Sequence, residues 1–183
     1  MGSEELTPGL LVAMPSLKDP YFEKSVILLC NYTPESAFGL VVNNPSSIRI
    51  KDIIVSDLEF KDNLNSPLLL GGPVQQESLW AIHSEDFSCD TTSQVSPDIS
   101  ISGIHEVLGA LAREEGPNHY HLGCGYAGWA PGQLDREIEE GAWWLTSLET
   151  EFVLDIPYSE RWESILKKIG IDPLSSFYES NDF

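Results

Sequence analysis

The stretch GCGYAGWAPGQLDREIEEGAWW, residues 123–144, is the most informative part of the sequence for the fold. Gly123, Gly125 and Gly128 follow a strand-like run, and a tryptophan and a Pro-Gly break separate them from a helical pattern. Glycine loses more backbone entropy on folding than other residues, so a cluster indicates tight turns or close backbone approach. The segment is therefore either a loop that faces a ligand or a crowded junction inside the fold. The sequence leaves both alternatives open.

The same glycines match the spelling G-x-G-x-x-G of the dinucleotide-binding fingerprint. In that motif the helix begins within the glycines, so that its N-terminus faces the pyrophosphate. Here residues 129–131 intervene before the helical pattern, and too little chain follows Gly128 for the rest of a two-halved nucleotide fold. We therefore interpret the glycines as packing residues and expect no cofactor.

Short apolar runs alternate with helical patterns along the rest of the chain. Strands are expected over residues 10–13, 25–29, 38–42, 68–70, 79–83, 119–124 and 152–156, with a hairpin over 88–102. Helices are expected over residues 50–54, 104–111, 134–145 and 162–169. Apolar runs without alternation predict strands covered on both faces. The pattern predicts one domain over residues 1–183 of mixed α/β (α+β) class, with a mostly buried mixed sheet flanked by about four helices.

Charge restricts the class of partner. The chain has 10 Lys and Arg against 29 Asp and Glu, a net charge of −19. This surface repels phosphates, so we do not expect direct nucleic-acid binding. No apolar run reaches the ~18 residues of a membrane span, and the opening MGSEELTPGL lacks the basic stretch and apolar core of a signal peptide. We expect a cytoplasmic protein that does not associate with membranes and whose partner is another protein or a small molecule.

His83 is the titratable residue with the most suggestive position. It follows the apolar run of residues 79–82 and precedes the acidic pair Glu85-Asp86. An imidazole oriented by a carboxylate can act as a base, but no G-x-S-x-G nucleophile motif occurs in the sequence. The pattern favours a strand-end histidine with a structural hydrogen bond. We expect no catalytic residues.

Metal and disulfide sites are not expected either. His119 and His121 share one face of a predicted strand, but the next positions on that face are glycines, which offer no ligands. Cys30, Cys89 and Cys124 are odd in number and lack paired spacing, so they predict no disulfide framework.

Several motifs occur in a fixed order along the chain. They are LLVAMPSLKDPYFEKSVILLCNY (Leu10 to Tyr32), FGLVVNNP (Phe38 to Pro45), GGPV (Gly71 to Val74), a strand that ends in His83, GYAGWAPGQLDREI (Gly125 to Ile138), Trp143 and Arg161-Trp162. In these motifs the chain resembles the YqgE/AlgH-like family of bacterial proteins. The resemblance implies a compact cytosolic α/β fold on a mixed sheet, with a small plait-like α+β portion. It implies no established activity, cofactor or catalytic residue, and some members carry the label of transcriptional regulator.

The family motifs define one candidate binding surface on this chain. Its members are Gly71, Gly72, Pro73, His83, Tyr126, Gly128, Trp129, Gly132 and Gln133. The first hypothesis is a non-enzymatic protein that acts through protein contacts, as an indirect regulator. The alternative is a small-molecule-binding protein or unrecognised enzyme with a pocket between the GGPV and GYAGW segments and His83 as its titratable member. A DNA-binding regulator is a third hypothesis, suggested by the family label alone.

Overall fold

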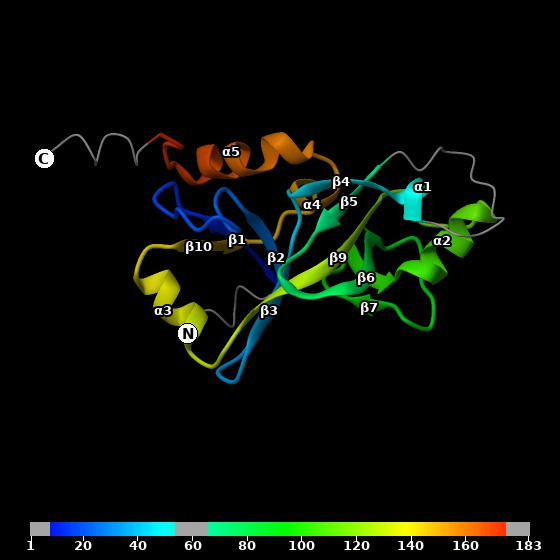
Figure 1. Ribbon diagram of the computed structural model, residues 1–183, viewed down its shortest axis with the longest axis horizontal. Coiled ribbons are helices and arrows are strands. Elements are labelled where there is room, and N and C mark those ends of the chain that lie inside the picture. The colour runs from blue at the N-terminus through cyan, green and yellow to red at the C-terminus, as the bar shows by residue number, and fades with distance from the viewer. Residues whose placement is uncertain (1–7, 54–65, 175–183) are drawn as a thin grey trace, which may run out of the picture. The chain divides into compact units, whose positions relative to one another are not determined.

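The structure is a computed structural model that describes residues 8–53 and 66–174. Within these ranges it has ten strands and five helices, divided between two compact units (Figure 1). The first unit comprises Met1–Asn43 and Ala127–Phe183, and the second comprises Asn44–Tyr126. Strand β9 (Tyr120–Trp129) contributes its first residues to the second unit and its last residues to the first. This mixed architecture confirms the predicted fold class.

An antiparallel sheet with strand order β10-β1-β2-β3-β9 forms the first unit. Its other strands are β1 (Gly9–Ala13), β2 (Val26–Tyr32), β3 (Ala37–Val41) and β10 (Trp143–Ser147). Every residue of β1 is buried, which explains why its sequence is apolar without alternation. Strand β10 lies at the end of this order and pairs with β1.

Helices cover both faces of the sheet in the first unit (Figure 1). Helix α3 (Gln133–Glu139) buries Leu134 in an apolar cluster with the sheet. Helices α4 (Glu151–Leu154) and α5 (Tyr158–Ile169) cover the opposite face. The Nε1 of Trp162 on α5 donates a hydrogen bond to the carbonyl of Ala13 on β1 at 2.8 Å, which anchors the helix to the sheet.

A buried cation also fixes α5. Arg161 is 1% exposed, and it donates hydrogen bonds from Nε to the carbonyl of Ile156 at 2.7 Å and from Nη1 to that of Val42 at 2.6 Å. Its guanidinium lies 4.8 Å from the ring centre of Tyr158. Burial lowers the pKa of Arg161 to about 10, while Tyr158 and Asp155 oppose the shift. The cation supplies buried carbonyls with the partners that water cannot provide there.

The second unit is built around β9 and β6 (Val74–Ser84), which run antiparallel. The strand order continues from β6 to β8 (Ile99–Gly103) and β7 (Ser93–Gln94), while β5 (Pro67–Leu70) pairs with β9 in parallel and β4 (Pro45–Arg49) pairs with β5. Helix α1 (Ile50–Ile53) follows β4, and helix α2 (Ile104–Ala112) follows β8. The buried side of α2, with Ile104, Val107 and Leu108, packs in an apolar cluster with strand residues such as Leu122.

The GYAGW segment, for which a loop was one of two open alternatives, is the end of strand β9. Two local predictions were wrong. The helix predicted to run to residue 145 ends at Glu139, and Trp143 and Trp144 begin strand β10. The run 152–156, predicted as a strand, lies largely in helix α4. Most of the other predicted elements are present, including the hairpin between β7 and β8 and the stop of α5 at Gly170.

Candidate functional site

The glycine cluster of β9 forms a slot for one indole ring in the second unit. A Cβ on Gly123 would lie 2.3 Å from Cη2 of Trp80, and one on Gly71 would lie 2.7 Å from its Cζ2. Trp80 donates a hydrogen bond from Nε1 to the carbonyl of Gly125 at 2.8 Å. Gly125 has φ +74°, and a Cβ there would lie 2.4 Å from the carbonyl oxygen of Gly72. Of the two alternatives for this segment, the structure shows the crowded junction.

The GGPV turn and the start of the GYAGW segment lie side by side in this unit. Val74 pairs with Tyr126, and Gly71 donates a backbone hydrogen bond to Cys124 at 2.8 Å. Pro73 is exposed and Tyr126 is half-buried. His83 does not join them, because it lies at the opposite end of β6, where it pairs with Tyr120, and its side chain is completely buried.

The other predicted site residues lie in the first unit. Trp129 is buried, with its ring centre 6.2 Å from that of Trp143 in an edge-to-face arrangement. Gly128 is exposed opposite Phe38. Gly132 has φ +74° at the turn before α3, where Gln133 accepts a hydrogen bond from the N–H of Ala130 through Oε1 at 3.0 Å. The burial of His83 and Trp129 corrects the expectation that these two side chains meet an outside molecule.

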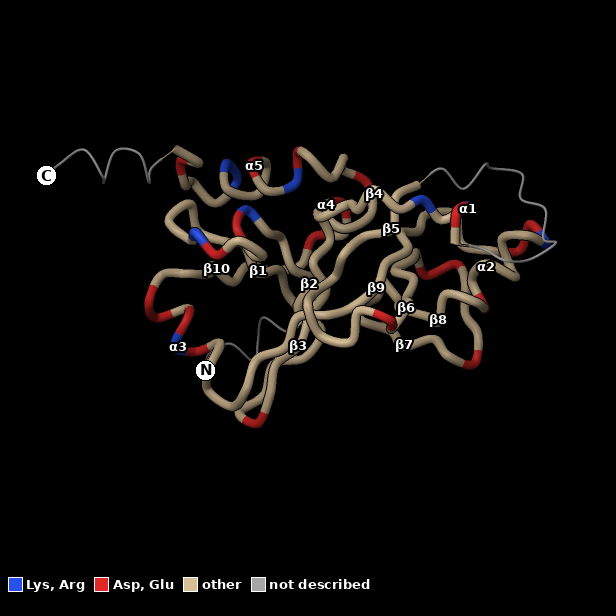
Figure 2. Tube along the Cα trace, viewed as in Figure 1, with Lys and Arg blue, Asp and Glu red and all other residues tan. Residues whose placement is uncertain are grey.

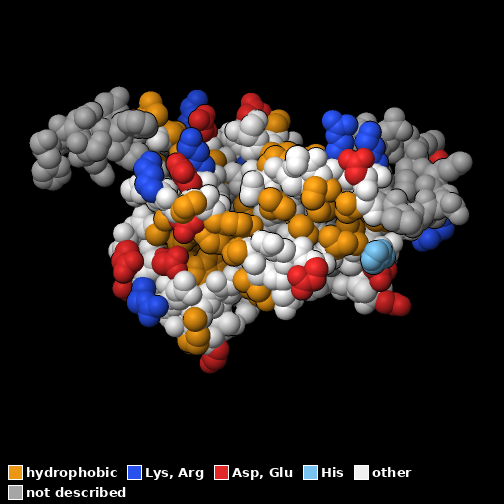
Figure 3. Space-filling model, viewed as in Figure 1, with side chains coloured by type: hydrophobic (Ala, Val, Ile, Leu, Met, Phe, Trp, Pro, Cys, Tyr) orange, Lys and Arg blue, Asp and Glu red, His pale blue; other side chains and the backbone are white. Residues whose placement is uncertain are grey.

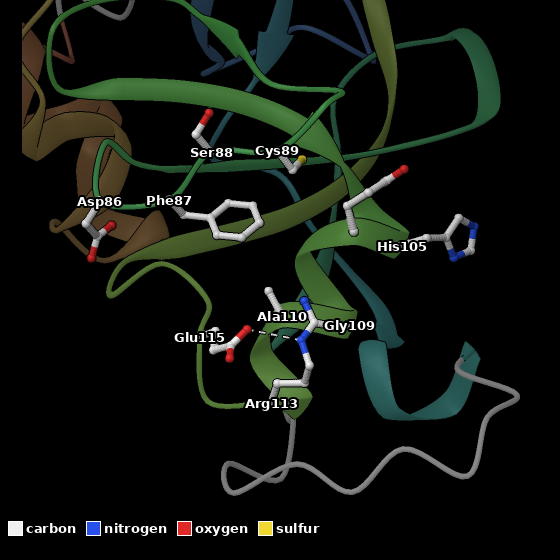
Figure 4. Close-up of a pocket in the computed structure, with 10 residues that line it drawn as sticks. Asp86, Phe87, Ser88, Cys89, His105, Gly109, Ala110, Arg113 and Glu115 are labelled. Carbon is white, nitrogen blue, oxygen red and sulfur yellow. Dashed lines mark hydrogen bonds and ion pairs between the residues drawn. The ribbon is translucent and has the colours of Figure 1, made fainter.

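A pocket that the sequence did not predict lies in the second unit, between the loop after β6 and helix α2 (Figure 4). Its volume is about 580 Å³, within the roughly 300–1,000 Å³ of small-molecule sites. Phe87 and Cys89 point from the loop toward α2, and Arg113 points toward them from the helix (Figure 4). The remaining lining residues are Asp86, Ser88, His105, Glu106, Gly109, Ala110 and Glu115. Charges of both signs thus surround one aromatic ring and one thiol.

Hydroxyl groups surround the thiol of Cys89. Its Sγ lies 3.2 Å from Oγ1 of Thr91 and accepts a hydrogen bond from Oγ1 of Thr92 at 3.4 Å. Desolvation raises the pKa of this thiol, but hydrogen bonds from Thr91, Thr92 and Ser102 outweigh it, so the pKa lies below its usual value. Burial acts alone on the other two cysteines and raises the pKa of Cys30 to about 12 and that of Cys124 above its usual value. Cys89 is therefore the most readily ionised thiol of the chain.

The hydroxyl chain continues from Cys89 to His83. Oγ1 of Thr92 lies 2.7 Å from Oγ of Ser102, which lies 2.7 Å from Nε2 of His83. Nδ1 of His83 lies 2.7 Å from the carbonyl oxygen of Ser84, which can only accept, so Nδ1 carries a proton. The two hydroxyl groups thus connect the thiol of Cys89 to the buried imidazole of His83. The Thr91-Thr92 pair just after Cys89 was the sequence signal for this arrangement.

The outer edge of β10 is a second feature that the sequence did not predict. Trp144 is 47% exposed, and Ser147 at the strand end is also exposed. Figure 3 shows hydrophobic side chains over β10 and β1 between α3 and α5, bordered by acidic side chains. Figure 2 shows acidic residues on α3 and in the turn that leads into β10. This edge combines exposed apolar surface with negative charge.

Comparison with known proteins defines the class of this fold. A solution structure of the AlgH protein from Pseudomonas aeruginosa is similar with a TM-score of 0.77 and 28% identity, over 93% of this chain and 92% of that chain. A crystal structure from Corynebacterium diphtheriae has the same fold, with a TM-score of 0.73 and 24% identity over 94% and 91% of the two chains. The fold is therefore that of the AlgH protein.

Sequence comparison gives the family. The model of a family described as AlgH-like matches residues 10–174. A UPF0301 protein of Vibrio parahaemolyticus is 34% identical over 92% of this chain and 94% of its own, and one of Anaeromyxobacter dehalogenans is 37% identical over 92% and 90%. The chain belongs to the AlgH-like family, which confirms the resemblance seen in the motifs. No helix among residues 8–53 and 66–174 is long and apolar enough to cross a membrane.

Proposed function

We propose that the protein acts in the cytoplasm by binding another protein, as an indirect regulator that catalyses no reaction. One observation carries this proposal: Trp144 exposes 47% of its surface on the outer edge of β10. Tryptophan is among the residues that dominate binding energy at protein interfaces. All three cysteines are free thiols, which fits a reducing compartment.

Two supporting features concern the rest of the surface. The net charge of −19 favours a basic partner. Of the residues that the family motifs marked, Pro73 and Gly128 are exposed, and Tyr126, Gly132 and Gln133 are partly exposed. We propose these five as additional contacts, each within its own unit.

The test replaces Trp144 and measures partner capture. A photo-crosslinking amino acid at position 147 of the same strand, with Trp144 left in place, should trap one protein reproducibly in living cells, and that protein should bind the purified wild type. Trp144→Ser should weaken this binding by roughly 2 kcal/mol or more, as expected for an interface hot spot. Ile48→Ser, which removes a 43%-exposed apolar side chain from β4 in the other unit, is the matched control. Equal binding by wild type and Trp144→Ser would contradict the proposal.

Binding of a small molecule is a second candidate function, favoured by the 580 Å³ pocket beside α2. Its mixed charges and half-buried thiol suit a polar ligand with both acidic and basic groups. A thermal-shift screen of metabolites and nucleotides tests this function, because a ligand at 100 times its Kd stabilises the fold by about 2.7 kcal/mol. Arg113→Ala should abolish the shift while Arg136→Ala, on another helix, should not.

We do not propose that the protein binds DNA directly. The chain carries only 10 cationic residues against 29 anionic ones. Duplex DNA at low ionic strength provides the check, since a DNA-binding protein shows affinity there that falls steeply with salt. We expect no such binding.

A further inference from the structure

We propose that the outer edge of β10 accepts an extended, basic segment of a partner protein as an additional strand. This inference rests on the proposed function and names the chemistry of the partner. It follows from the direction of the β10 backbone groups, from a groove beside the strand and from the charges at both strand ends.

The hydrogen-bonding pattern shows which backbone groups of β10 face outward. Met14 donates its N–H to the carbonyl of Ala142 at 2.9 Å, so these opposed residues form a hydrogen-bonded pair. In an antiparallel ladder such pairs alternate along the strand. Trp144 and Thr146, opposite Val12 and Leu10, therefore direct their N–H and C=O groups toward β1. Leu145 and Ser147 direct theirs away from β1, where an added strand can bind them.

Among residues 8–53 and 66–174, nothing gives strand β10 the usual protection of an edge. Natural edge strands are guarded by lysines, prolines, bulges or inward-pointing charges, because an unguarded edge pairs with other chains. The sequence of β10 is WWLTS, with no charge and no proline, and its register with β1 is unbroken over five residue pairs. Such an edge is suited to pairing.

A groove beside β10 can take a side chain of the added strand. It lies between the sheet and α5, has a volume of about 220 Å³ and is lined by Thr146 and Ser147 of β10. Its apolar lining residues are Leu10, Phe152, Ile165 and Ile169, and the ion pair of Lys168 with Glu149 also lines it. The volume is below that of typical small-molecule sites, so the groove fits a single apolar side chain. Trp144 lies on the same face of β10 as Thr146 and extends this apolar surface.

The charges favour a basic segment over a second copy of this chain. Glu149 after β10 is already paired with Lys168, but Glu139 and Glu140 are exposed just before β10 and Glu151 is exposed after it. A second copy with a net charge of −19 would bring like charges together at both ends of the strand. Lysine or arginine residues on either side of an apolar anchor would instead pair with these carboxylates.

Fluorescence anisotropy with a defined peptide tests the inference on the full-length protein. The probe is a fluorescein-labelled peptide Lys-Val-Lys-Leu-Lys-Val-Lys, and its matched control carries Glu in place of every Lys. The lysine peptide should bind saturably and lose affinity with rising salt, and the glutamate peptide should not bind. Ser147→Pro removes an outward N–H and should raise the Kd about tenfold or more, while Ser147→Ala should leave it nearly unchanged.

Two further measurements separate strand addition from loose electrostatic attraction. The peptide should slow hydrogen exchange at the amide of Leu145, which faces outward, more than at that of Thr146, which already faces β1. Trp144→Ala provides a second variant if Ser147→Pro fails to fold, and it should also weaken binding. Thermal unfolding of each variant establishes that the fold is intact.

Several outcomes would overturn the inference. Equal peptide binding by wild type, Ser147→Pro and Trp144→Ala would show that the edge is not used, and so would unchanged exchange at Leu145. A dimer in solution that Ser147→Pro dissociates would assign the edge to a second copy. Peptide binding seen only after deletion of residues 1–7 would assign it to the chain's own N-terminus. If capture of a cellular partner requires Trp144 but Ser147→Pro leaves the Kd of the peptide unchanged, strand addition fails and the proposed function stands. If neither partner capture nor peptide binding requires Trp144, the strand addition and the proposed function both fail.

Discussion

Trp80 shows how single residues determine the packing of the second unit. Its indole is 7% exposed and lies where Cβ atoms on Gly71 and Gly123 would be. The ring also provides the hydrogen-bond donor for the carbonyl of Gly125. Protein interiors are packed as densely as organic crystals, so an added methyl group has no space to enter without displacing the ring.

Gly123→Ala should therefore destabilise the protein by about 1–3 kcal/mol, as overpacking of a well-filled core does. The new Cβ would lie 2.3 Å from Cη2 of Trp80 and 2.8 Å from the carbonyl oxygen of Leu69. Urea unfolding measures the change. Gly109→Ala is the control, because its nearest neighbour is the end of Arg113 at 3.4 Å, and alanine should stabilise helix α2 by about 0.5–1 kcal/mol. An equal change in unfolding free energy for Gly123→Ala and Gly109→Ala would show that Trp80 does not fill the space beside Gly123.

From the sequence, the glycine cluster indicated either a ligand-facing loop or a crowded junction. The choice between the two depends on Trp80, which lies on β6 and is brought opposite Gly123 by the pairing of β6 with β9. For His83 the sequence favoured a strand-end histidine with a structural hydrogen bond, and the structure shows its ring hydrogen-bonded to Ser102 and Ser84 at the end of β6. Its connection to Cys89 runs through Ser102, a residue of another strand, so no local pattern reveals it.

Cys89 should react with iodoacetamide faster than Cys30 and Cys124 at neutral pH. Alkylation requires the thiolate, and only Cys89 has a lowered pKa, so its rate should rise with pH through a midpoint below that of an ordinary thiol. Mass spectrometry of the labelled peptides gives the three rates. Thr92→Val removes one donor and should move the midpoint to higher pH, whereas Thr146→Val, in the other unit, should not. Fastest labelling at Cys30 would contradict this assignment.

At the scale of elements, the chain between α3 and β10 differs from the helix that the hydrophobic pattern predicted there. Leu134, Ile138, Ala142 and Leu145 continue a helical spacing, which led to the prediction of a helix to residue 145. The helix ends at Glu139 because Gly141 has φ +81°, a left-handed conformation typical of helix ends. The glycine was the local signal for the end. For the run 152–156 no such signal existed, since a short apolar run fits a buried strand and a buried helix equally.

Arg161→Ala should loosen α5 and destabilise the protein by about 3 kcal/mol. The substitution leaves the carbonyls of Val42 and Ile156 without this donor, and an unsatisfied buried group costs about 1–3 kcal/mol. Chemical denaturation measures the loss. Glu163→Ala, at an exposed position of the same helix, should change stability by no more than about 0.5 kcal/mol. A similar loss for both variants would show that the buried cation has no special role.

At the scale of the whole molecule, charge is the dominant property. The sequence has 29 acidic and 10 basic residues, and this charge was the basis for expecting no nucleic-acid partner, which stays a prediction. The position of the exposed edge was not evident, because it depends on which strand ends the sheet order. Strand order follows from long-range pairing such as β1 with both β2 and β10, which no short pattern encodes.

Salt should stabilise the protein. Like charges on a molecule with a net charge of −19 repel one another in the folded state, and ions screen this repulsion. The Debye length falls from about 30 Å at 0.01 M salt to about 8 Å at 0.15 M. The Tm should therefore rise between these two concentrations of NaCl, as measured by calorimetry. A lower Tm at the higher concentration would indicate that favourable ion pairs outweigh the repulsion.

The burial of Trp80 between glycines gives the second unit a tryptophan fluorescence signal of its own. The chain has five tryptophans, and Trp80 is the one that falls within Asn44–Tyr126. A variant with phenylalanine at the other four positions would emit from the second unit alone, at the short wavelength of an indole shielded from water. A red shift of that emission would then report the opening of this unit by itself, and a ligand of the α2 pocket should delay that shift during unfolding.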